Sequence, residues 1–122
     1  DLQHAIYADD ITLWTTKGCP GQVEQTLQFA TDAIHTNTQA IGLACAPQKS
    51  ELLVMKPSPR APTITVLLDN APIPKVPRLR LLGLHIQQDT RATYTIHLLQ
   101  RQINQITHLI RRISSRNHGL KE

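Results

Sequence analysis

The stretch that decides the fold lies near the start of the chain, where residues 2–16 read LQHAIYADDITLWTT. Two short runs, residues 2–7 and residues 11–16, are rich in β-branched and aromatic side chains, and they flank the acidic break Ala8-Asp9-Asp10. Such runs on either side of turn-forming residues predict a β-hairpin. Side chains alternate between the two faces of a strand, so one face of this hairpin can be buried while the other meets solvent.

A helix is predicted directly after the hairpin. Residues 17–21 form a turn by composition, and Pro20 is well placed to begin a helix. Gly42 is suited to end it. Many positions between are Gln, Thr or Asn, which indicates a surface helix with one buried stripe. The apolar residues of that stripe recur at helical spacing, and they are Val23, Leu27, Ala30, Ile34 and Ile41.

The middle of the chain is predicted to hold short strands interrupted by prolines. We expect an irregular connection at residues 56–62, which contain three prolines, and a turn at residues 69–72. Prolines 72, 74 and 77 cannot donate to a central ladder, so edge-strand or hairpin structure is expected around them. The predicted strands are residues 51–55, 63–68 and 79–86.

The last predicted element is a long amphipathic helix with a narrow apolar seam. We expect it to pack in a small helical bundle, with a short coiled-coil strip as the alternative. Its other faces are basic, and the helix is expected to end at Asn117-His118-Gly119. The seam residues repeat at intervals of three and four, and they are Ile96, Leu99, Ile103, Ile106, Ile110 and Ile113.

Charge is distributed unevenly along the chain. Residues 1–55 carry two basic and six acidic side chains, a net charge of −4, whereas residues 56–122 carry eleven basic and three acidic ones, a net charge of +8. The whole chain therefore has a net charge of +4. An acidic part followed by a basic part fits metal chemistry in one place and polyanion contact in another. A basic surface kept for solubility explains the charge equally well.

Length and composition exclude several classes of protein. At 122 residues the chain has the size of one domain with a modest core. It has no run of eighteen apolar residues, so no transmembrane helix is expected, and no secretory leader is recognised. Cys19 and Cys45 have no further ligands at zinc spacing, so we expect reduced thiols and no zinc site. The chain opens with Asp1 inside a predicted strand, and we expect N-terminal sequence to be missing.

The adjacent carboxylates of Asp9 and Asp10 are the candidate metal site. Two such charges repel by about 4 kcal/mol at a surface-like dielectric. Water tolerates this repulsion at an exposed turn, where Asp is a favoured residue, so a purely structural turn explains the bare pair. The functional alternative is that they hold Mg²⁺, which prefers carboxylate and phosphate oxygen. Two such ions about 4 Å apart activate an attacking hydroxyl and stabilise the leaving oxygen in phosphoryl transfer.

Three ordered motifs resemble one family. Tyr7-Ala8-Asp9-Asp10 between apolar strands resembles the aromatic-x-Asp-Asp signature of reverse transcriptases, and YADDITLW at residues 7–14 is similar to that motif in the non-LTR (LINE-type) retrotransposon enzymes. Gly42-Leu43 with PQKSEL at residues 47–52 is similar to the family's Gly-Leu…Pro-x-Lys-Ser/Thr-Glu segment. LGLHI at residues 82–86 resembles the segment that forms the hairpin gripping the primer end. The resemblance covers nearly the whole chain.

The resemblance implies a fold and an activity. The fold is α+β: a partial polymerase palm at residues 1–86, an antiparallel sheet with a packed helix and a primer-grip-like hairpin, followed by the start of a helical thumb at residues 87–122. The implied activity is RNA-directed DNA polymerisation with Mg²⁺ or Mn²⁺. Its implied partners are an RNA template, a DNA primer and deoxynucleotide triphosphates, with no membrane, in the nucleus or the cytoplasm. The oligomeric state is left open.

The resemblance also implies roles for single residues. Asp9 matches the metal ligand of the motif, with Asp10 as a supporting carboxylate. Lys49 matches a lysine that protonates or neutralises the departing pyrophosphate. The structural alternatives are a strand aromatic at Tyr7, a solvated lysine, a strand bend at Gly83 and ordinary surface arginines. Nucleic-acid contacts are implied for Tyr7, Ala8, Leu82, Gly83, Leu84, Arg101, Arg111, Arg112 and Arg116.

The family also needs parts that this sequence does not contain. It requires a further metal-binding aspartate from an earlier palm strand, and fingers that bind the incoming nucleotide. We therefore expect the chain alone to be inactive, and we expect its exposed sheet edge to favour aggregation. The alternative is a stand-alone nucleic-acid-binding protein, or a degenerate or domesticated retroelement remnant without catalysis. A palm-fold nucleotide cyclase explains neither the Gly83 segment nor the basic helix.

Overall fold

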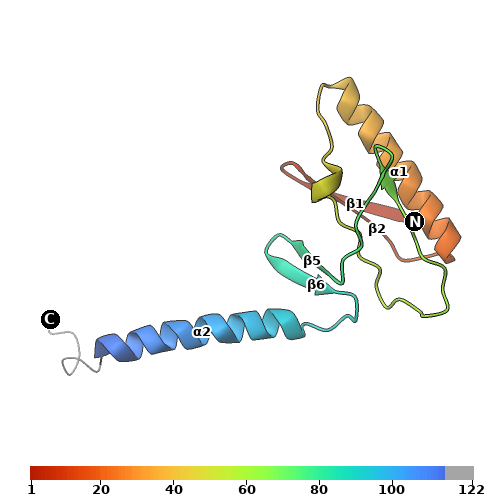
Figure 1. Ribbon diagram of the computed structural model, residues 1–122. Helices are drawn as coiled ribbons and strands as arrows, with labels where there is room; N and C mark the ends of the chain where they lie inside the picture. Colours follow the sequence, from red (N-terminus) through yellow and green to blue (C-terminus); the bar gives the residue numbers. More distant parts are fainter. Residues whose placement is uncertain (115–122) are drawn as a thin grey trace.

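Two helices and small antiparallel sheets make up the part of the chain that the computed structural model describes, residues 1–114. This confirms the predicted α+β class. Helix α1 lies beside the first hairpin, and α2 projects away from the other elements (Figure 1). The elements in chain order are β1 (Leu2–Tyr7), β2 (Asp10–Thr15), α1 (Pro20–Ala40), the 3-10 turn η1 (Pro47–Lys49), β3 (Leu67–Leu68), β4 (Ala71–Pro72), β5 (Arg78–Leu81), β6 (Leu84–Gln87) and α2 (Thr93–Ser114).

Strands β1 and β2 form the predicted hairpin. Their antiparallel register extends from the Leu2–Thr15 pair to the Tyr7–Asp10 pair, so Asp10 already belongs to β2. Every residue of β1 is exposed, and among the described residues β1 pairs only with β2. An isolated two-stranded hairpin is marginally stable in water, so this hairpin depends on its contact with α1.

Helix α1 begins and ends close to where its sequence predicts. Pro20 is its first residue, and the backbone N–H of Cys19 donates to Oε1 of Gln22 at 3.1 Å. At the other end Gly42 has φ +78°, and its N–H donates to the carbonyl of Gln39 at 3.0 Å. A glycine in this left-handed conformation is a common helix terminator because it has no Cβ to strain.

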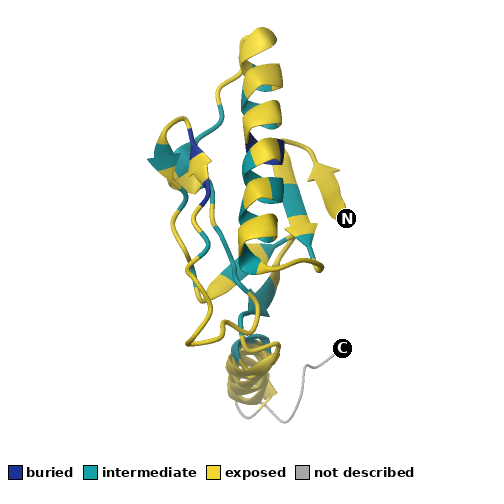
Figure 2. Cartoon of the chain, turned by 90° about the vertical axis from the view of Figure 1, so that its right-hand side faces the viewer, coloured by how far each residue is buried: buried dark blue, intermediate teal, exposed yellow. Residues whose placement is uncertain are grey.

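The core is small and lies between α1 and the segment leading into β3. Its buried members are Ala30 and Thr31 on α1, with Val66 and Leu68 opposite them. Val66 is the most deeply buried side chain, at 2% exposure. The buried positions in Figure 2 are accordingly confined to the middle of α1 and the adjoining segment.

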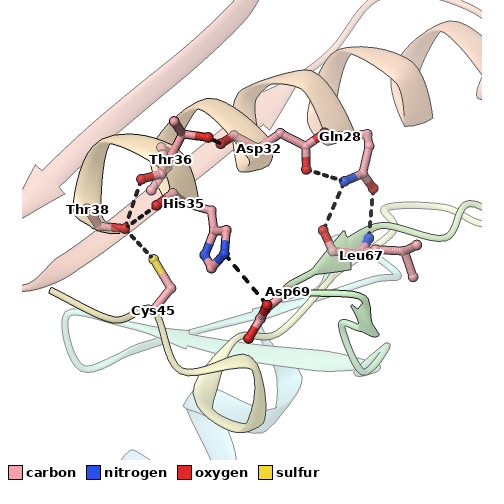
Figure 3. Close-up of polar contacts among 9 residues, drawn as sticks. Gln28, Asp32, His35, Thr36, Thr38, Cys45, Leu67 and Asp69 are labelled. Atoms are coloured by element: carbon pink, nitrogen blue, oxygen red, sulfur yellow. Dashed lines mark hydrogen bonds and ion pairs between the residues drawn. The ribbon is translucent and has the colours of Figure 1, made fainter. Parts of the chain in front are cut away.

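The predicted strand at residues 63–68 is wrong in extent, because only Leu67 and Leu68 form a strand. Side chains of α1 take the hydrogen bonds that a neighbouring strand would otherwise provide. Glu24 accepts from the N–H of Thr65 at 2.7 Å. The amide of Gln28 accepts from the N–H of Leu67 at 2.8 Å and donates to the Leu67 carbonyl at 3.0 Å (Figure 3). Residues 63–68 are therefore hydrogen-bonded to side chains of α1 rather than to a neighbouring strand.

The predicted strand at residues 51–55 is also wrong. Leu52 makes only an isolated parallel bridge with Lys75. Its N–H donates to the carbonyl of Pro74, and its carbonyl accepts from the N–H of Val76, both at 2.9 Å. Pro74 has no N–H to donate, and Pro77 directly follows Val76, so the pairing cannot be extended in either direction.

The predicted single strand at residues 79–86 is instead the β5–β6 hairpin. Leu82 and Gly83 form its two-residue turn, with φ +48° and +85°. Positive φ at both turn residues matches the twist of a hairpin. The turn predicted at residues 69–72 is shorter than expected, since Asp69 and Asn70 alone form it and the next two residues pair as β4.

Helix α2 is joined to the β5–β6 hairpin at its first turns. The side-chain oxygen of Gln87 accepts from the N–H of Tyr94 at 2.9 Å, and the Thr95 hydroxyl donates to the His85 carbonyl at 3.4 Å. The Arg78 guanidinium lies 3.6 Å from the centre of the Tyr94 ring. The boundary expected between the palm at residues 1–86 and the thumb at residues 87–122 falls within β6, which extends to Gln87.

The long C-terminal helix is confirmed as α2, but its predicted packing in a bundle is not seen. In the described part of the chain α2 packs at its first turns against the β5–β6 hairpin and projects away from α1, and its seam residues are exposed (Figure 1). Neither helix of residues 1–114 is long and apolar enough to cross a membrane. Arg116 and the predicted helix end at residues 117–119 lie outside the described residues.

Candidate functional site

The Asp9-Asp10 pair lies at the tip of the β1–β2 hairpin. Ala8 and Asp9 form the two-residue turn, and Ala8 has φ +53°. For an L-residue with a Cβ this conformation costs about 1–2 kcal/mol. Asp10 is paired directly with Tyr7, so both side chains leave the hairpin on one face. Both residues are exposed, Tyr7 at 65%, so the tip presents a carboxylate beside an aromatic ring.

The two carboxylates are free to take a ligand. No hydrogen bond or ion pair formed within residues 1–114 occupies the side-chain oxygens of Asp9 or Asp10. Adjacent exposed carboxylates are hard oxygen donors of the type that Mg²⁺ and Mn²⁺ accept, so these residues fit such an ion by donor chemistry. They form a pair only, since no group of three or more His, Cys, Asp or Glu placed to hold a metal occurs in the described residues.

Lys49 ends the η1 turn and is exposed. The turn is fixed by its own backbone, because the Ser50 N–H and hydroxyl both donate to the carbonyl of Ala46, at 3.2 and 3.1 Å. The Lys49 ammonium takes part in no ion pair in the part of the chain that is described. No ion pair joins it to Asp9 or Asp10 there either. In Figure 1, η1 and the tip of the β1–β2 hairpin lie on the same side of α1.

The Leu82-Gly83-Leu84 segment forms the exposed tip of the β5–β6 hairpin. Leu82 is 63% and Leu84 66% exposed. A Cβ built on Gly83 would meet nothing within 4 Å, so the space over this glycine is open. The tip therefore exposes two apolar side chains and the backbone of Gly83 to solvent.

The basic residues Arg101, Arg111 and Arg112 are all exposed on α2. In the heptad set by the seam they occupy positions away from it, so the helix separates an apolar side from a basic one. A shallow, open depression follows the polar side, and His97, Arg101 and His108 are among its lining residues. The structure does not bring these arginines into contact with the two aspartates.

Two structural groups escaped the sequence analysis. One is the joint made by Arg78, His85, Gln87 and Tyr94, in which the His85 and Tyr94 rings meet edge to face at 4.8 Å. One sequence feature could have indicated this joint: Tyr94 and Leu98, four residues apart, form a second apolar pair outside the 3-4 seam at the start of the helix. The other is the pair of hydrogen bonds between the Gln28 side chain and the backbone of Leu67 in β3. No local sequence pattern indicates them, because the two residues are 39 positions apart.

The candidate residues within residues 1–114 thus occupy four exposed features: the β1–β2 tip, Lys49 on η1, the β5–β6 tip and the basic side of α2. Comparison with known proteins found no family model, no curated protein and no solved structure that matches this chain.

Proposed function

We propose that this chain is the C-terminal part of the palm and the start of the thumb of an RNA-directed DNA polymerase of the non-LTR retrotransposon type. The observation that carries the proposal concerns the three hairpin turns. The two turns with motif residues force Ala8 and Leu82 to positive φ, whereas the third uses Asp69 and Asn70, which tolerate it. Strained backbone is a feature of many functional sites. Positive φ also occurs outside the motifs, at Lys56 and Thr90, so the order of the three motifs and the exposure of their turns carry the assignment together with the strain.

The β1–β2 tip supplies the proposed reaction centre. Asp9 and Asp10 would hold Mg²⁺ or Mn²⁺, and such an ion supplies Lewis acidity and charge neutralisation for phosphoryl transfer. Tyr7 offers an apolar ring beside Asp10, a surface on which a terminal nucleotide can stack. Lys49, an exposed ammonium with no ion-pair partner in the described residues, is suited to neutralise a departing pyrophosphate.

The β5–β6 tip and α2 supply the proposed grip on nucleic acid. Leu82 and Leu84 offer apolar contact with sugar and base, and the open space over Gly83 allows a phosphate backbone to approach the peptide. The joint at Tyr94 fixes α2 relative to this tip. The arginines of α2 are placed to contact phosphates, which adds salt-dependent affinity that does not depend on sequence.

Primer extension by the longest open reading frame that contains this chain tests the proposal. In that protein Asp9→Asn and Asp10→Asn should each lower the extension rate about 100-fold or more, because each removes a charged metal ligand. Asp32→Asn is the matched control, since Asn keeps the oxygen that accepts from Gln28. The 122-residue chain alone should extend no primer. Unchanged extension in both aspartate variants would contradict the proposal.

Duplex nucleic-acid binding without catalysis is a second candidate function. It is favoured by the exposed arginines of α2, which act independently of the carboxylates. The same variants separate the two candidates. A polymerase loses extension and keeps duplex affinity when Asp9 or Asp10 is changed, whereas a binding protein shows no extension in any form and the same affinity throughout.

A further inference from the structure

A similar five-residue pattern occurs twice on α2. Residues 97–101 read HLLQR and residues 108–112 read HLIRR, so each segment places an arginine four residues after a histidine. Side chains at this spacing are neighbours on a helix surface, with Cβ atoms about 5–6 Å apart. The two His–Arg pairs are therefore His97 with Arg101 and His108 with Arg112, and all four residues are exposed.

The two His–Arg pairs lie on one side of α2. The second pair follows the first after three helical turns plus about 20°, and about 16 Å further along the axis. Tyr94, which joins α2 to the β5–β6 hairpin, is seven residues before Arg101 and therefore lies on the same side. The apolar seam occupies the opposite side. A shallow, open depression follows the side of the pairs, and both histidines and Arg101 line it.

Neither His–Arg pair has an anionic partner in the described residues. None of the ion pairs within residues 1–114 includes a side chain of either pair. Between Thr93 and Ser114 the helix holds no acidic residue. The β5–β6 hairpin packed against its first turns holds none either, and its ionisable residues are Arg78, Arg80 and His85. A positive charge on either histidine therefore meets repulsion from the arginine four residues later.

We propose that each His–Arg pair binds one phosphate of a nucleic-acid duplex, with the histidine protonated. Arginine presents a planar fork of N–H donors that matches phosphate oxygens, and a protonated imidazole donates from both nitrogens. A phosphate between the two side chains replaces the repulsion of like charges with charge-assisted hydrogen bonds. The inference rests on the proposed duplex contact of α2, and it adds His97 and His108 to that surface.

Binding of the duplex is then coupled to proton uptake. Histidine is the side chain whose charge ordinarily changes between about pH 5 and pH 8. A ligand that prefers the protonated form binds more tightly as the pH falls. Each phosphate contact adds about 0.9 to the slope of log affinity against log salt. Two histidines that become charged should therefore steepen this slope by about 1.8 when the pH is lowered across that range.

Fluorescence anisotropy of a labelled duplex with the 122-residue chain tests the proposal, at about pH 8 and at about pH 5.5. The wild-type salt slope should be steeper at the lower pH. His97→Gln combined with His108→Gln should remove this change and leave the slope at the higher pH as it is. His4→Gln, which removes an exposed histidine from β1, is the matched control and should keep the wild-type change.

A second double variant tests the charge itself. His97→Arg combined with His108→Arg should show at about pH 8 the slope that the wild type reaches only at about pH 5.5, because arginine keeps its charge at both. Circular dichroism at both pH values confirms that each variant keeps its helix.

Failure of the His–Arg pairs can be told apart from failure of the proposed duplex contact. Duplex binding with the same salt slope at both pH values would overturn the pairs and leave the arginine surface in place. A steepening that survives in the double Gln variant, or one that His4→Gln removes equally, would assign proton uptake to other histidines and overturn them as well. A chain that binds no duplex at either pH would overturn both.

Discussion

At the residue scale, the three hairpin turns differ in how well their residues suit a positive φ. Asp69 and Asn70, at +52° and +60°, belong to the residue types that enter this region most readily. Ala8 at +53° and Leu82 at +48° do not, and each conformation costs about 1–2 kcal/mol. Leu82 also exposes most of its side chain to water. The same conformation occurs at Lys56, at +46°, and at Thr90, at +63°, so the two tips share this local cost with two connecting segments.

Gly83→Ala tests whether the bare backbone of the β5–β6 tip is used. Gly83 and Gly42 both have positive φ, and a Cβ at either one meets nothing within 4 Å. Alanine should therefore destabilise the protein by a similar amount at both positions, about 1 kcal/mol, measured by urea unfolding. Only Gly83→Ala should also weaken binding of a primer–template duplex, measured by fluorescence anisotropy. Equal duplex affinity in the two variants would argue against close approach at Gly83.

Leu82→Asn is expected to separate stability from function. Asn-Gly is the preferred pair for this turn, so the variant should gain about 1 kcal/mol in the free energy of unfolding. If Leu82 contacts nucleic acid, the same variant should bind the duplex more weakly. Asn70→Gly in the β3–β4 turn is the control, because Asn already suits its conformation and neither quantity should change much. A Leu82→Asn protein that is more stable and binds unchanged would remove Leu82 from the proposed grip.

At the element scale, the elements that depend on neighbouring residues in the sequence could be predicted, whereas those that depend on distant residues could not. Helix α1, helix α2 and the β1–β2 hairpin depend on local features: Pro20 and Gly42 at helix ends, a 3-4 repeat, and two apolar runs around a short turn. The segment at residues 63–68 depends on Gln28, 39 positions away, and the segment at residues 51–55 on Pro74. No local pattern encodes such partners, and the strands predicted there were wrong.

Gln28→Ala tests the hold of α1 on β3. The variant removes three hydrogen bonds, one of them to exposed Asp32, and leaves the N–H and carbonyl of Leu67 without these partners, which should cost about 1–3 kcal/mol of stability. Gln25→Ala, an exposed position on the same helix, should change stability by less than about 0.5 kcal/mol. Thermal unfolding followed by circular dichroism compares the two. Equal losses would mean that Leu67 finds other partners.

At the scale of the whole molecule, the buried core is small and the exposed apolar surface large. Among residues 1–114 four are buried, whereas β1, both hairpin tips and the α2 seam expose large apolar side chains. The exposure of the motif turns could be anticipated from their composition. The joint that fixes α2 to the β5–β6 hairpin could not, because Arg78 and Tyr94 meet only once both elements are formed.

The outer edge of β1 is expected to drive aggregation. It offers unpaired backbone groups and exposed apolar side chains, including Ile6 at 65%. Ile6→Lys should slow aggregation at high concentration, measured by light scattering. Phe29→Lys replaces an even more exposed side chain, at 78%, on a helix, and should slow it less. A larger effect of the helix variant would show that general apolar exposure matters more than the strand edge.

Duplex affinity should depend on salt through the arginines of α2. Replacing Arg101, Arg111 or Arg112 with Ala should each reduce the slope of log affinity against log salt by about 0.9. Arg60→Ala, on the proline-rich connection, should leave the slope unchanged. Fluorescence anisotropy over a range of salt concentrations measures the slopes. A change that is equal for all four variants would assign the salt dependence to overall charge.

Because α2 is attached to the β5–β6 hairpin at its first turns, a small change of angle there moves the far end of the helix a long way. The attachment is the contact of Tyr94 with Arg78, His85 and Gln87, and the whole helix of 22 residues is about 33 Å long. A tilt of about 10° at this attachment displaces the far end by about 6 Å, given that length. The contacts of Tyr94 therefore decide where the far end of α2 lies.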